Sequence, residues 1–467
     1  MTMSLEEIQE SNKFREDPIR CLAWRVSKGE AGDFLYSIQD GKFLMYNKGY
    51  WKEIRDIELL SRIENGLLDK DKNKICTKLP IARRKLIIEN YKLLQFKYIS
   101  DFNNKSLLNL ENYMFDPVGI NVLKHDKEYL STIRVPYKYD GLAKCELWIK
   151  TLKEILEGDN EKISALQEFF GYCLTKDVTM EKALLLLGES RSGKSTILNT
   201  LQYMIGDENC SHVGLMNLEN PQYTSMMINK LVNIDGEVSK KASDYEAQFK
   251  TIVTGHEVNC NDKYMPPFKF RPFCKFVMSA NEFPKITDHS SAFYKRLILI
   301  PCNRVFEEHE QDRQLRNKLL LELPGILNWA IEGLKRLNIR GRFESYNFMK
   351  QAVDELENEN NPAYIFFDEH INISMGNYVV KSELYDKYKQ WSQDTKNYPL
   401  SENRFSQCVF KKYSKQTSKD ARLGHGGKRV WKNIEYLNFK SPCEPTANGS
   451  GVQSPAGNNL EEIKWEE

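Results

Sequence analysis

Residues 183–196 read ALLLLGESRSGKST, an apolar run that leads straight into a glycine loop ending in Lys194 and Ser195. Residues 188–195 fit the pattern G-x-x-x-x-G-K-[ST], whose glycines let backbone N–H groups curl around a phosphate. The run before the loop has the length of a buried strand, and the stretch after it, TILNTLQYMI, has helical spacing. A strand, a loop and a helix in this order predict a phosphate site on a parallel α/β sheet.

We expect the whole loop to hold nucleotide phosphates, with Lys194 reaching the β- and γ-phosphates and the Ser195 hydroxyl ligating Mg²⁺. The residues of this predicted site are Gly188, Glu189, Ser190, Arg191, Ser192, Gly193, Lys194, Ser195 and Thr196. By itself, such a loop does not separate a kinase from a switch or a motor.

Two acidic residues end a later apolar run, in the stretch KLVNIDGE of residues 230–237. Residues two apart on a strand share a face, so Asp235 and Glu237 would both point at the nucleotide if the extended backbone continues through Gly236. Asp235 suits an outer contact to Mg²⁺, and Glu237 suits activation of water, but the division of these roles stays open. The alternative is an ordinary strand end with solvated acids.

Two further polar residues flank apolar runs. Asn281 ends the run FVMSAN, where an amide can orient an attacking water molecule; alternatively, it starts the turn that follows. Arg296 stands just ahead of the run LILIP and could stabilise the charge of phosphoryl transfer, often from a neighbouring subunit. A surface ion pair is the commoner fate of a single arginine.

Other stretches predict the remaining architecture. Between residues 180 and 305, the runs KLVNID, FCKFVMSAN and RLILIP alternate with helical stretches, which is typical of a parallel α/β domain. Residues 34–51 place aromatic pairs around the turns Asp40-Gly41 and Lys48-Gly49, which predicts a small β-meander. Residues 147–174 have helical spacing.

Composition narrows the function classes. The 467 residues suggest several domains, and 67 Lys and Arg against 65 Asp and Glu mean that any basic surface must be local. No apolar run reaches the roughly 18 residues that cross a bilayer, and the acidic N-terminus is unlike a secretory signal. The ten Cys form no CxxC pair, so we expect neither zinc nor disulfides, and a cytoplasmic location.

The stretch VNCNDKYMPPFKFR predicts a basic hairpin. Residues 258–261 and 268–271 can pair as arms, with Lys263 and Tyr264 near the tip. A lysine can grip a phosphate and a tyrosine can stack on a base, so both are candidates for single-stranded DNA, with Lys269 beside them. Lys269 serves equally well as a solvated strand residue.

A second basic block covers residues 403–432, where nine Lys and Arg accompany a single acid, Asp420. This local excess suggests a nucleic-acid footprint, with a helix opening near residue 401 and a glycine-rich wing turn at residues 424–429. The candidate contacts are Arg404, Lys411, Lys412, Lys428 and Arg429. The alternative is a solvated basic face.

The order of these features resembles the superfamily 3 DNA helicases of phages, plasmids and poxviruses, which are often fused to primases. The resemblance implies a AAA+ -like ATPase that forms a hexameric ring around DNA, with ATP between subunits and 3′-to-5′ translocation. Residue by residue, it implies a first motif at Lys194 and Ser195, a second at Asp235 and Glu237, a sensor at Asn281, an arginine finger at Arg296 and a pore residue at Lys263. The Gly236 between the two acids departs from the adjacent acids or single Glu of many members.

The resemblance also divides the chain. It implies a largely helical collar (106–178), the ATPase domain (179–358) and a winged-helix DNA-binding domain (359–440). We expect a mixed α+β domain before the collar (1–105), where the resemblance is weaker, and a disordered tail (441–467), which is rich in Ser, Pro, Gly and Asn. Neither an acidic metal cluster nor zinc spacing for a primase centre stands in the first hundred residues.

We therefore expect an ATP- and Mg²⁺-dependent replicative helicase, and replication initiator, of a phage, plasmid or genomic island. Its expected partners are single-stranded DNA in the pore, origin duplex at the C-terminal domain, further copies of itself, and a primase or other replication proteins, but no membrane. The alternatives are an ATP-regulated DNA-binding initiator that does not unwind, and a P-loop kinase acting on a small molecule.

Overall fold

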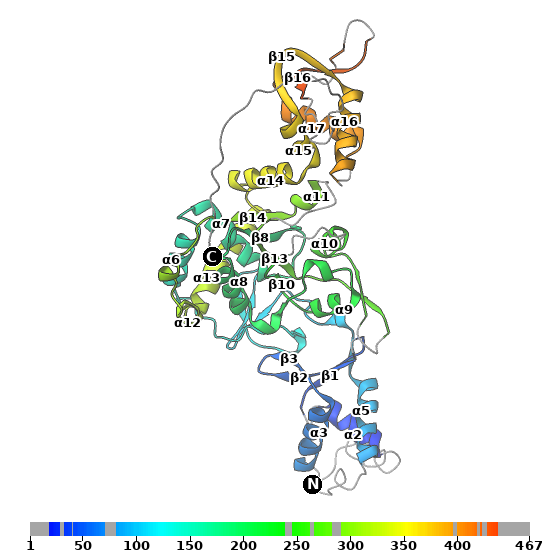
Figure 1. The fold of residues 1–467 in the computed structure, drawn as a ribbon. Coiled ribbons are helices and arrows are strands. Elements are labelled where there is room, and N and C mark those ends of the chain that lie inside the picture. Colours follow the sequence, from blue (N-terminus) through cyan, green and yellow to red (C-terminus); the bar gives the residue numbers. More distant parts are fainter. Residues whose placement is uncertain are drawn as a thin grey trace, which may run out of the picture. The chain divides into compact units, whose positions relative to one another are not determined.

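The computed structural model describes residues 18–28, 32–39, 41–70, 81–238, 245–261, 266–282, 291–395, 399–417, 421–422 and 427–437 (Figure 1). Contacts divide the chain into two units, residues 1–360 and residues 361–467. Among the residues that the structure describes, the helices are too short or too polar to cross a bilayer.

In the part of the chain that the structure describes, the first unit begins with a four-stranded sheet and the helices α2, α3 and α5. The strands lie in the order β3-β2-β1-β4, and the antiparallel pairing of β1 with β2 and of β2 with β3 confirms the predicted meander. Residues of α2 and α5 pack with the sheet in one apolar cluster. The elements are α2 (Pro18–Ser27), β1 (Phe34–Ser37), β2 (Lys42–Asn47), β3 (Tyr50–Ile54), α3 (Asp56–Lys70), α5 (Ile81–Leu94) and β4 (Phe96–Lys97).

Residues 106–178 are helical only in their second half, so the expectation of a largely helical region is wrong. The apolar runs of the first half are too short for helices, and they form the antiparallel sheet β5-β6-β7. The elements are β5 (Leu108–Asn109), β6 (Met114–Asp116), β7 (Asn121–Leu123), η2 (Lys127–Tyr129), α6 (Glu146–Ile155) and α7 (Asn160–Cys173).

A five-stranded parallel sheet forms the centre of the first unit. Its strand order is β14-β8-β13-β10-β9, so β13 lies between the strand that precedes the glycine loop and the strand that ends in Asp235. The elements are β8 (Ala183–Leu187), β9 (Cys210–Ser211), β10 (Val232–Asp235), β13 (Lys275–Ala280) and β14 (Leu297–Pro301). All four strands predicted in this region are present, and the parallel α/β class is confirmed.

Both faces of this sheet are covered, which explains why its strands are apolar throughout. Successive side chains of β8 alternate between two cores: Leu184 and Leu186 pack with α7, α8 and α13, whereas Ala183 and Leu185 pack with α10. The helices that follow the loop in sequence are α8 (Lys194–Ile205), α9 (Pro221–Thr224), α10 (Glu246–Val253), α11 (Ser291–Tyr294), α12 (Leu315–Leu321), α13 (Leu323–Arg340) and α14 (Asn347–Asn360).

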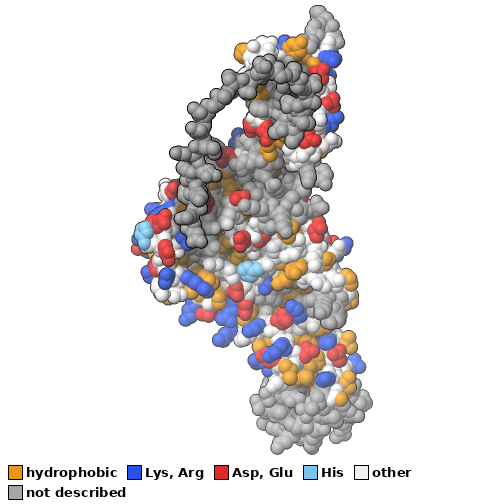
Figure 2. Space-filling view, viewed as in Figure 1, with side chains coloured by type: hydrophobic (Ala, Val, Ile, Leu, Met, Phe, Trp, Pro, Cys, Tyr) orange, Lys and Arg blue, Asp and Glu red, His pale blue; other side chains and the backbone are white. Residues whose placement is uncertain are grey.

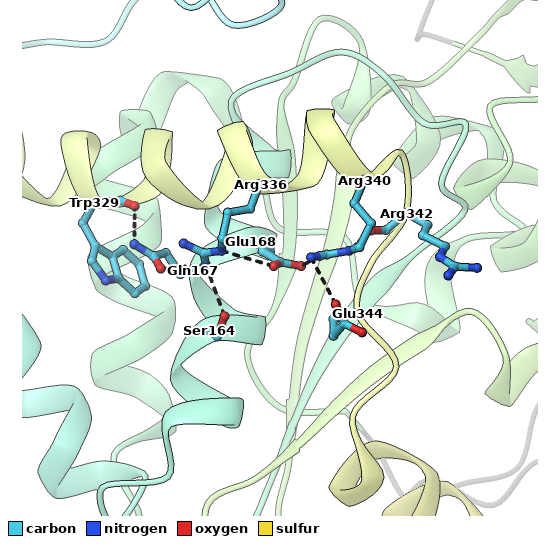
Figure 3. Close-up of polar contacts among 8 residues, drawn as sticks. All are labelled: Ser164, Gln167, Glu168, Trp329, Arg336, Arg340, Arg342 and Glu344. Atoms are coloured by element: carbon cyan, nitrogen blue, oxygen red, sulfur yellow. Dashed lines mark hydrogen bonds and ion pairs between the residues drawn. The ribbon is translucent and has the colours of Figure 1, made fainter.

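A buried charge cluster fastens α7 to α13. Figure 3 shows Arg336 and Arg340 of α13 reaching toward Glu168 of α7, whose side chain is 1% exposed. Arg336 also donates to Gln167 Oε1 at 2.8 Å, and Arg340 pairs with Glu344 at 3.2 Å. One buried carboxylate is thereby shared between two arginines, so the two helices are held at a fixed register.

The second unit is a small α/β body. Its sheet pairs β15 with β16 in antiparallel fashion, and an antiparallel bridge joins Arg422 to Arg429 just ahead of β16. Aromatic side chains fill its core, with Tyr388 stacked on Phe405 at a ring distance of 4.4 Å. The elements are α15 (Pro362–His370), β15 (Ile371–Val380), α16 (Lys381–Asp394), α17 (Glu402–Tyr413) and β16 (Val430–Tyr436).

Candidate nucleotide site and DNA-facing elements

The glycine loop joins β8 to α8, as predicted. Gly193 caps α8 with a left-handed backbone (φ 86°), and a Cβ there would come within 2.6 Å of Ile155 in α6. A Cβ on Gly188 would lie 2.1 Å from the carbonyl oxygen of Cys302. Glycine is therefore required at both positions by the close approach of α6 and of the chain after β14.

Lys194 is the first residue of α8, and only 8% of it is exposed. Its Nζ donates hydrogen bonds to the carbonyl oxygens of Gly188 and Glu189, each at 2.7 Å, and to Ser192 Oγ at 3.3 Å. Burial lowers the pKa of this amino group. The loop thus wraps around its own lysine and keeps the cation beside the N-terminus of α8.

The neighbouring strand ends converge on this loop. Asn281 Nδ2, just after β13, donates to Ser190 Oγ at 3.4 Å, and the amide of Gly188 donates to the carbonyl oxygen of Ala280 at 3.2 Å. Ser279 Oγ donates to the carbonyl oxygen of Gly236, which ties β13 to the end of β10. The structure therefore brings Asn281 and the β10 end to the glycine loop.

The condition for a face shared by Asp235 and Glu237 is not met, because the backbone between them is not extended. β10 ends at Asp235, and the chain bends at Gly236 and Glu237 instead of staying extended. Glu237 lines the cavity beside the loop, whereas Asp235 Oδ2 accepts a hydrogen bond from Leu215 N at 2.9 Å. Burial raises the pKa of Asp235, against the effect of its backbone hydrogen bonds.

The cavity beside the loop has a volume of about 760 Å³. Its lining includes the exposed Ser195, Glu237 and Asn281 together with further charged side chains, among them Glu154 and Glu310. The lining also includes side chains that the sequence analysis missed, among them Ile155 of α6, Tyr203 of α8, Phe306, and Leu315 and Arg316 of α12. Arg316 lies over the Tyr203 ring at 5.0 Å.

Arg296 lies at the opposite end of the same sheet. It immediately precedes β14, whose Leu297 pairs with Ala183 at the start of β8, so the five-residue β8 separates it from the loop by roughly 16 Å. Its Nη2 pairs with Glu181 Oε2 at 3.1 Å. Within one chain, Arg296 is therefore remote from the other predicted catalytic residues.

The predicted basic hairpin is present. β11 (Val258–Cys260) pairs antiparallel with β12 (Phe268–Phe270), and Lys269 is exposed opposite Asn259. Thr224 Oγ1 donates to the carbonyl oxygen of Asn259 at 3.0 Å, which fastens the hairpin to α9. The predicted tip residues Lys263 and Tyr264 lie outside the described residues.

In the second unit, the candidate DNA contacts fall into two groups. Arg404 and Lys411 of α17 are exposed, as is Arg429 ahead of β16. Lys412 instead faces α15, where it pairs with Asp368 and lies 5.8 Å from the Phe367 ring. Lys428 pairs with Glu383 at 3.4 Å across an exposed surface.

The described surface carries mixed charge. On the face shown in Figure 2, acidic and basic side chains lie interspersed over both units. Among the described residues, no three His, Cys, Asp or Glu side chains gather as a metal-binding cluster. Mg²⁺ requires no such cluster, because it usually keeps several waters and binds one or two protein ligands together with phosphates.

Comparisons with known proteins relate this site to a family whose function is unknown. The model of that family, DUF5906, matches residues 186–296, a segment that runs from the end of β8 to Arg296. The match therefore contains the glycine loop, both acids, Asn281 and the hairpin.

Three named relatives are viral. V13 of Sputnik virophage, which carries the name helicase, is 24% identical over 351 residues, 67% of this chain and 42% of that protein. The DNA primase-polymerase of Nitratiruptor phage NrS-1 is 26% identical over 132 residues, 27% of this chain and 18% of that protein. L207/L206 of Acanthamoeba polyphaga mimivirus, also named as a helicase, is 22% identical over 218 residues, 44% of this chain and 23% of that protein. The chain spans less than half the length of each relative.

A solved structure shares the fold. The A-form apo structure of the NrS-1 C-terminal region aligns with a TM-score of 0.51 at 14% identity, over 88% of this chain and 98% of that one. At low identity, the chain is thus related to viral proteins with helicase and primase-polymerase names.

Proposed function

We propose that this chain is an ATP-driven DNA helicase of the superfamily 3 type, acting in replication of a phage, plasmid or similar element. One observation carries the proposal. The loop, Glu237 and Asn281 meet at one cavity, whereas Arg296 lies at the other end of the same sheet. A hydrolysis site divided in this way is completed when copies of the chain assemble, as in a ring.

The cavity fits Mg²⁺-ATP. The two glycines allow the loop backbone to approach a phosphate, the α8 N-terminus favours negative charge, and the Ser195 hydroxyl is a hard oxygen ligand for Mg²⁺. ATP would supply the phosphoryl group, and Mg²⁺ would neutralise its charge. Lys194 would exchange the Gly188 and Glu189 carbonyls for phosphate oxygens.

Within this proposal, Glu237 is the acid that takes a proton from the attacking water, because it is the acid that faces the cavity. Asn281 orients that water, and Asp235 positions the bend through its hydrogen bond to Leu215. The strand order supports a AAA+ -like core, since the position of β13 between β8 and β10 places Asn281 between the loop and Glu237.

Two elements would engage DNA. The hairpin β11–β12 is proposed to reach single-stranded DNA in the pore through Lys263 and Tyr264. The second unit, with its order α15–β15–α16–α17–β16, supports a winged-helix reading and duplex binding. The helicase names of two viral relatives agree with a role on DNA.

The decisive experiment is strand displacement on forked DNA with ATP, comparing wild type with Lys194→Ala. We expect displacement by wild type and none by the variant. An ATP-regulated initiator would bind both DNA and ATP but displace no strand, and a small-molecule kinase would hydrolyse ATP without response to DNA. Either outcome for the wild-type protein would overturn the proposal.

A further inference from the structure

Two aromatic rings are exposed at the edge of the N-terminal sheet. Phe96 of β4 is 43% exposed, and Tyr98, which continues the extended backbone of that strand, is 49% exposed. Residues two apart on an extended chain share a face, and the two rings lie 5.8 Å apart in an edge-to-face contact. Because β4 is the outer strand of the described sheet β3-β2-β1-β4, the rings lie at its border.

Aliphatic side chains enlarge this surface. Leu93 and Leu94 end α5 just before β4, and both are exposed, Leu93 by 77%. Ile38 is exposed beside the strand, where its amide donates to the carbonyl oxygen of Lys97 at 3.0 Å. Apolar side chains exposed together on a soluble protein mark a binding surface. We call this surface the edge platform, and its members are Ile38, Leu93, Leu94, Phe96 and Tyr98.

The sequence around the edge platform is basic. Residues 81–100 contain five Lys and Arg and one acid, Glu89. That acid pairs with Lys92 at 3.0 Å. The next acid along the chain, Asp101, accepts a hydrogen bond from Tyr98 N at 2.7 Å. Both acids are therefore engaged locally, which leaves an excess of positive charge beside the rings.

Three lysines can meet an anion that lies along the edge platform. Lys92 Nζ lies 5.0 Å from the Tyr36 ring, and Tyr36 is the partner of Phe96 in the pairing of β1 with β4. Lys97 stands between the two exposed rings in sequence, and Lys85 is exposed two turns before the end of α5. Among the described residues, neither Lys97 nor Lys85 pairs with an acid. Exposed rings beside available lysines are the two components of a site that stacks bases and neutralises phosphates.

We propose that the edge platform binds single-stranded nucleic acid, with bases stacked on Phe96 and Tyr98 and phosphates against Lys92 and Lys97. Duplex DNA fits less well, because its bases already stack on one another and offer no free ring face. An apolar protein partner would account for the exposed leucines but not for the available lysines. The site goes beyond the proposed function, since it lies on the sheet that precedes the ATPase region and needs no ATP.

The test uses the full-length chain without nucleotide and a short oligothymidine strand that carries one 5-iodouracil base. Ultraviolet light should crosslink this base to Tyr98, which peptide mass spectrometry detects. The crosslink yield against strand concentration gives the affinity of this site separately from other DNA contacts of the chain. Phe96→Ala should raise the half-saturating concentration by about 5- to 100-fold, because it removes a neighbouring stacking surface.

Two further variants separate stacking from charge. Lys97→Ala should reduce the slope of log affinity against log salt by about 0.7, the value for one phosphate contact on a single strand. Ile57→Ala is the matched control: Ile57 is an exposed apolar residue in α3, which follows β3 at the opposite edge of the sheet, and its loss should leave the crosslink unchanged. Thermal melting of each variant checks that the chain still folds.

Three results would overturn the proposal: no crosslink at Tyr98, the same half-saturating concentration in Phe96→Ala, or equal crosslinking by a duplex that carries the same base. If Phe96→Ala abolishes self-association and leaves the crosslink unchanged, the edge platform is a protein interface instead. None of these results depends on ATP hydrolysis. If the crosslink forms as expected but strand displacement fails, the edge platform stands and the helicase proposal does not.

Discussion

The two ends of the central sheet differ sharply, although the same strands build both. Where β8, β10 and β13 finish, the chain opens into the cavity lined by Lys194, Glu237 and Asn281. Where β13 begins, Lys275 is 2% exposed and donates to the carbonyl oxygens of Thr175 and Phe273. One end is concave and polar, and the other is packed against the segment that follows α7.

This difference shows where chemistry can occur. In parallel α/β sheets, ligands bind at the carboxyl ends of the strands, and the cavity lies at that end of this sheet. The end where the strands of the sheet begin carries the basic residues Lys182, Lys275 and Arg296. Burial lowers the pKa of Lys182 and that of Lys275. Under the proposed function, such a cation reaches the nucleotide of another copy of the chain and not that of its own.

The largest effect should follow from substitutions that inactivate one end of the sheet at a time. Arg296→Ala should lower the rate of ATP hydrolysis by about 10³-fold or more while ATP still binds, because an arginine finger acts mainly on the transition state. A mixture of Arg296→Ala with Lys194→Ala should regain hydrolysis that neither variant has alone. Phosphate release at fixed total protein measures it.

Glu181→Ala provides the control for Arg296, because it removes the same ion pair and keeps the arginine. If Glu181→Ala is as inactive as Arg296→Ala, or if the mixture stays inactive, the two ends do not meet across a subunit boundary.

The next effect compares the two acids at the loop end. Glu237→Gln should lower kcat by about 10²- to 10⁴-fold with little change in ATP affinity, since it removes a base from the cavity. Asp235→Asn should cost less, because its carboxylate bonds to Leu215 outside the cavity. Single-turnover hydrolysis distinguishes them, and a larger loss for Asp235→Asn would reverse our assignment.

Sequence reasoning succeeded where the determinants are local. The loop pattern fixes the turn from β8 to α8, and uninterrupted apolar runs identify the buried strands. It did not find the bend at Gly236, because glycine permits either an extended or a bent chain, and the hydrogen bond from Leu215 N to Asp235 Oδ2 joins distant parts of the sequence. Ile155 and Tyr203 carry no sequence signal for a cavity wall, since only packing of α6 and α8 brings them together.

A smaller effect tests whether the ion pairs between α7 and α13 stabilise the packed end of the sheet, where the strands begin. Arg340→Ala should lower the free energy of unfolding by about 3 kcal/mol, because it leaves the buried Glu168 carboxylate with Arg336 as its partner. Arg342→Ala is the control: its side chain points away from the cluster in Figure 3, so the change should stay within about 0.5 kcal/mol. Urea denaturation followed by tryptophan fluorescence measures both, and equal losses would show that the cluster adds nothing.

The smallest effect concerns pH. Burial lowers the pKa of Lys176 to about 7 and that of Lys275 to about 8, so in the folded chain both lose protons that the unfolded chain keeps to about pH 10. The unfolded state then binds more protons over that interval, and stability should rise with pH. Lys176→Met removes one such group and should reduce the slope by about 1 kcal/mol per pH unit near pH 8.5. Lys105→Met, an exposed neighbour, should leave the slope unchanged. If Lys176→Met leaves the slope of stability against pH unchanged, the Lys176 amino group stays charged in the folded chain. The two ends of the sheet would then differ in shape and not in the charge state of this lysine.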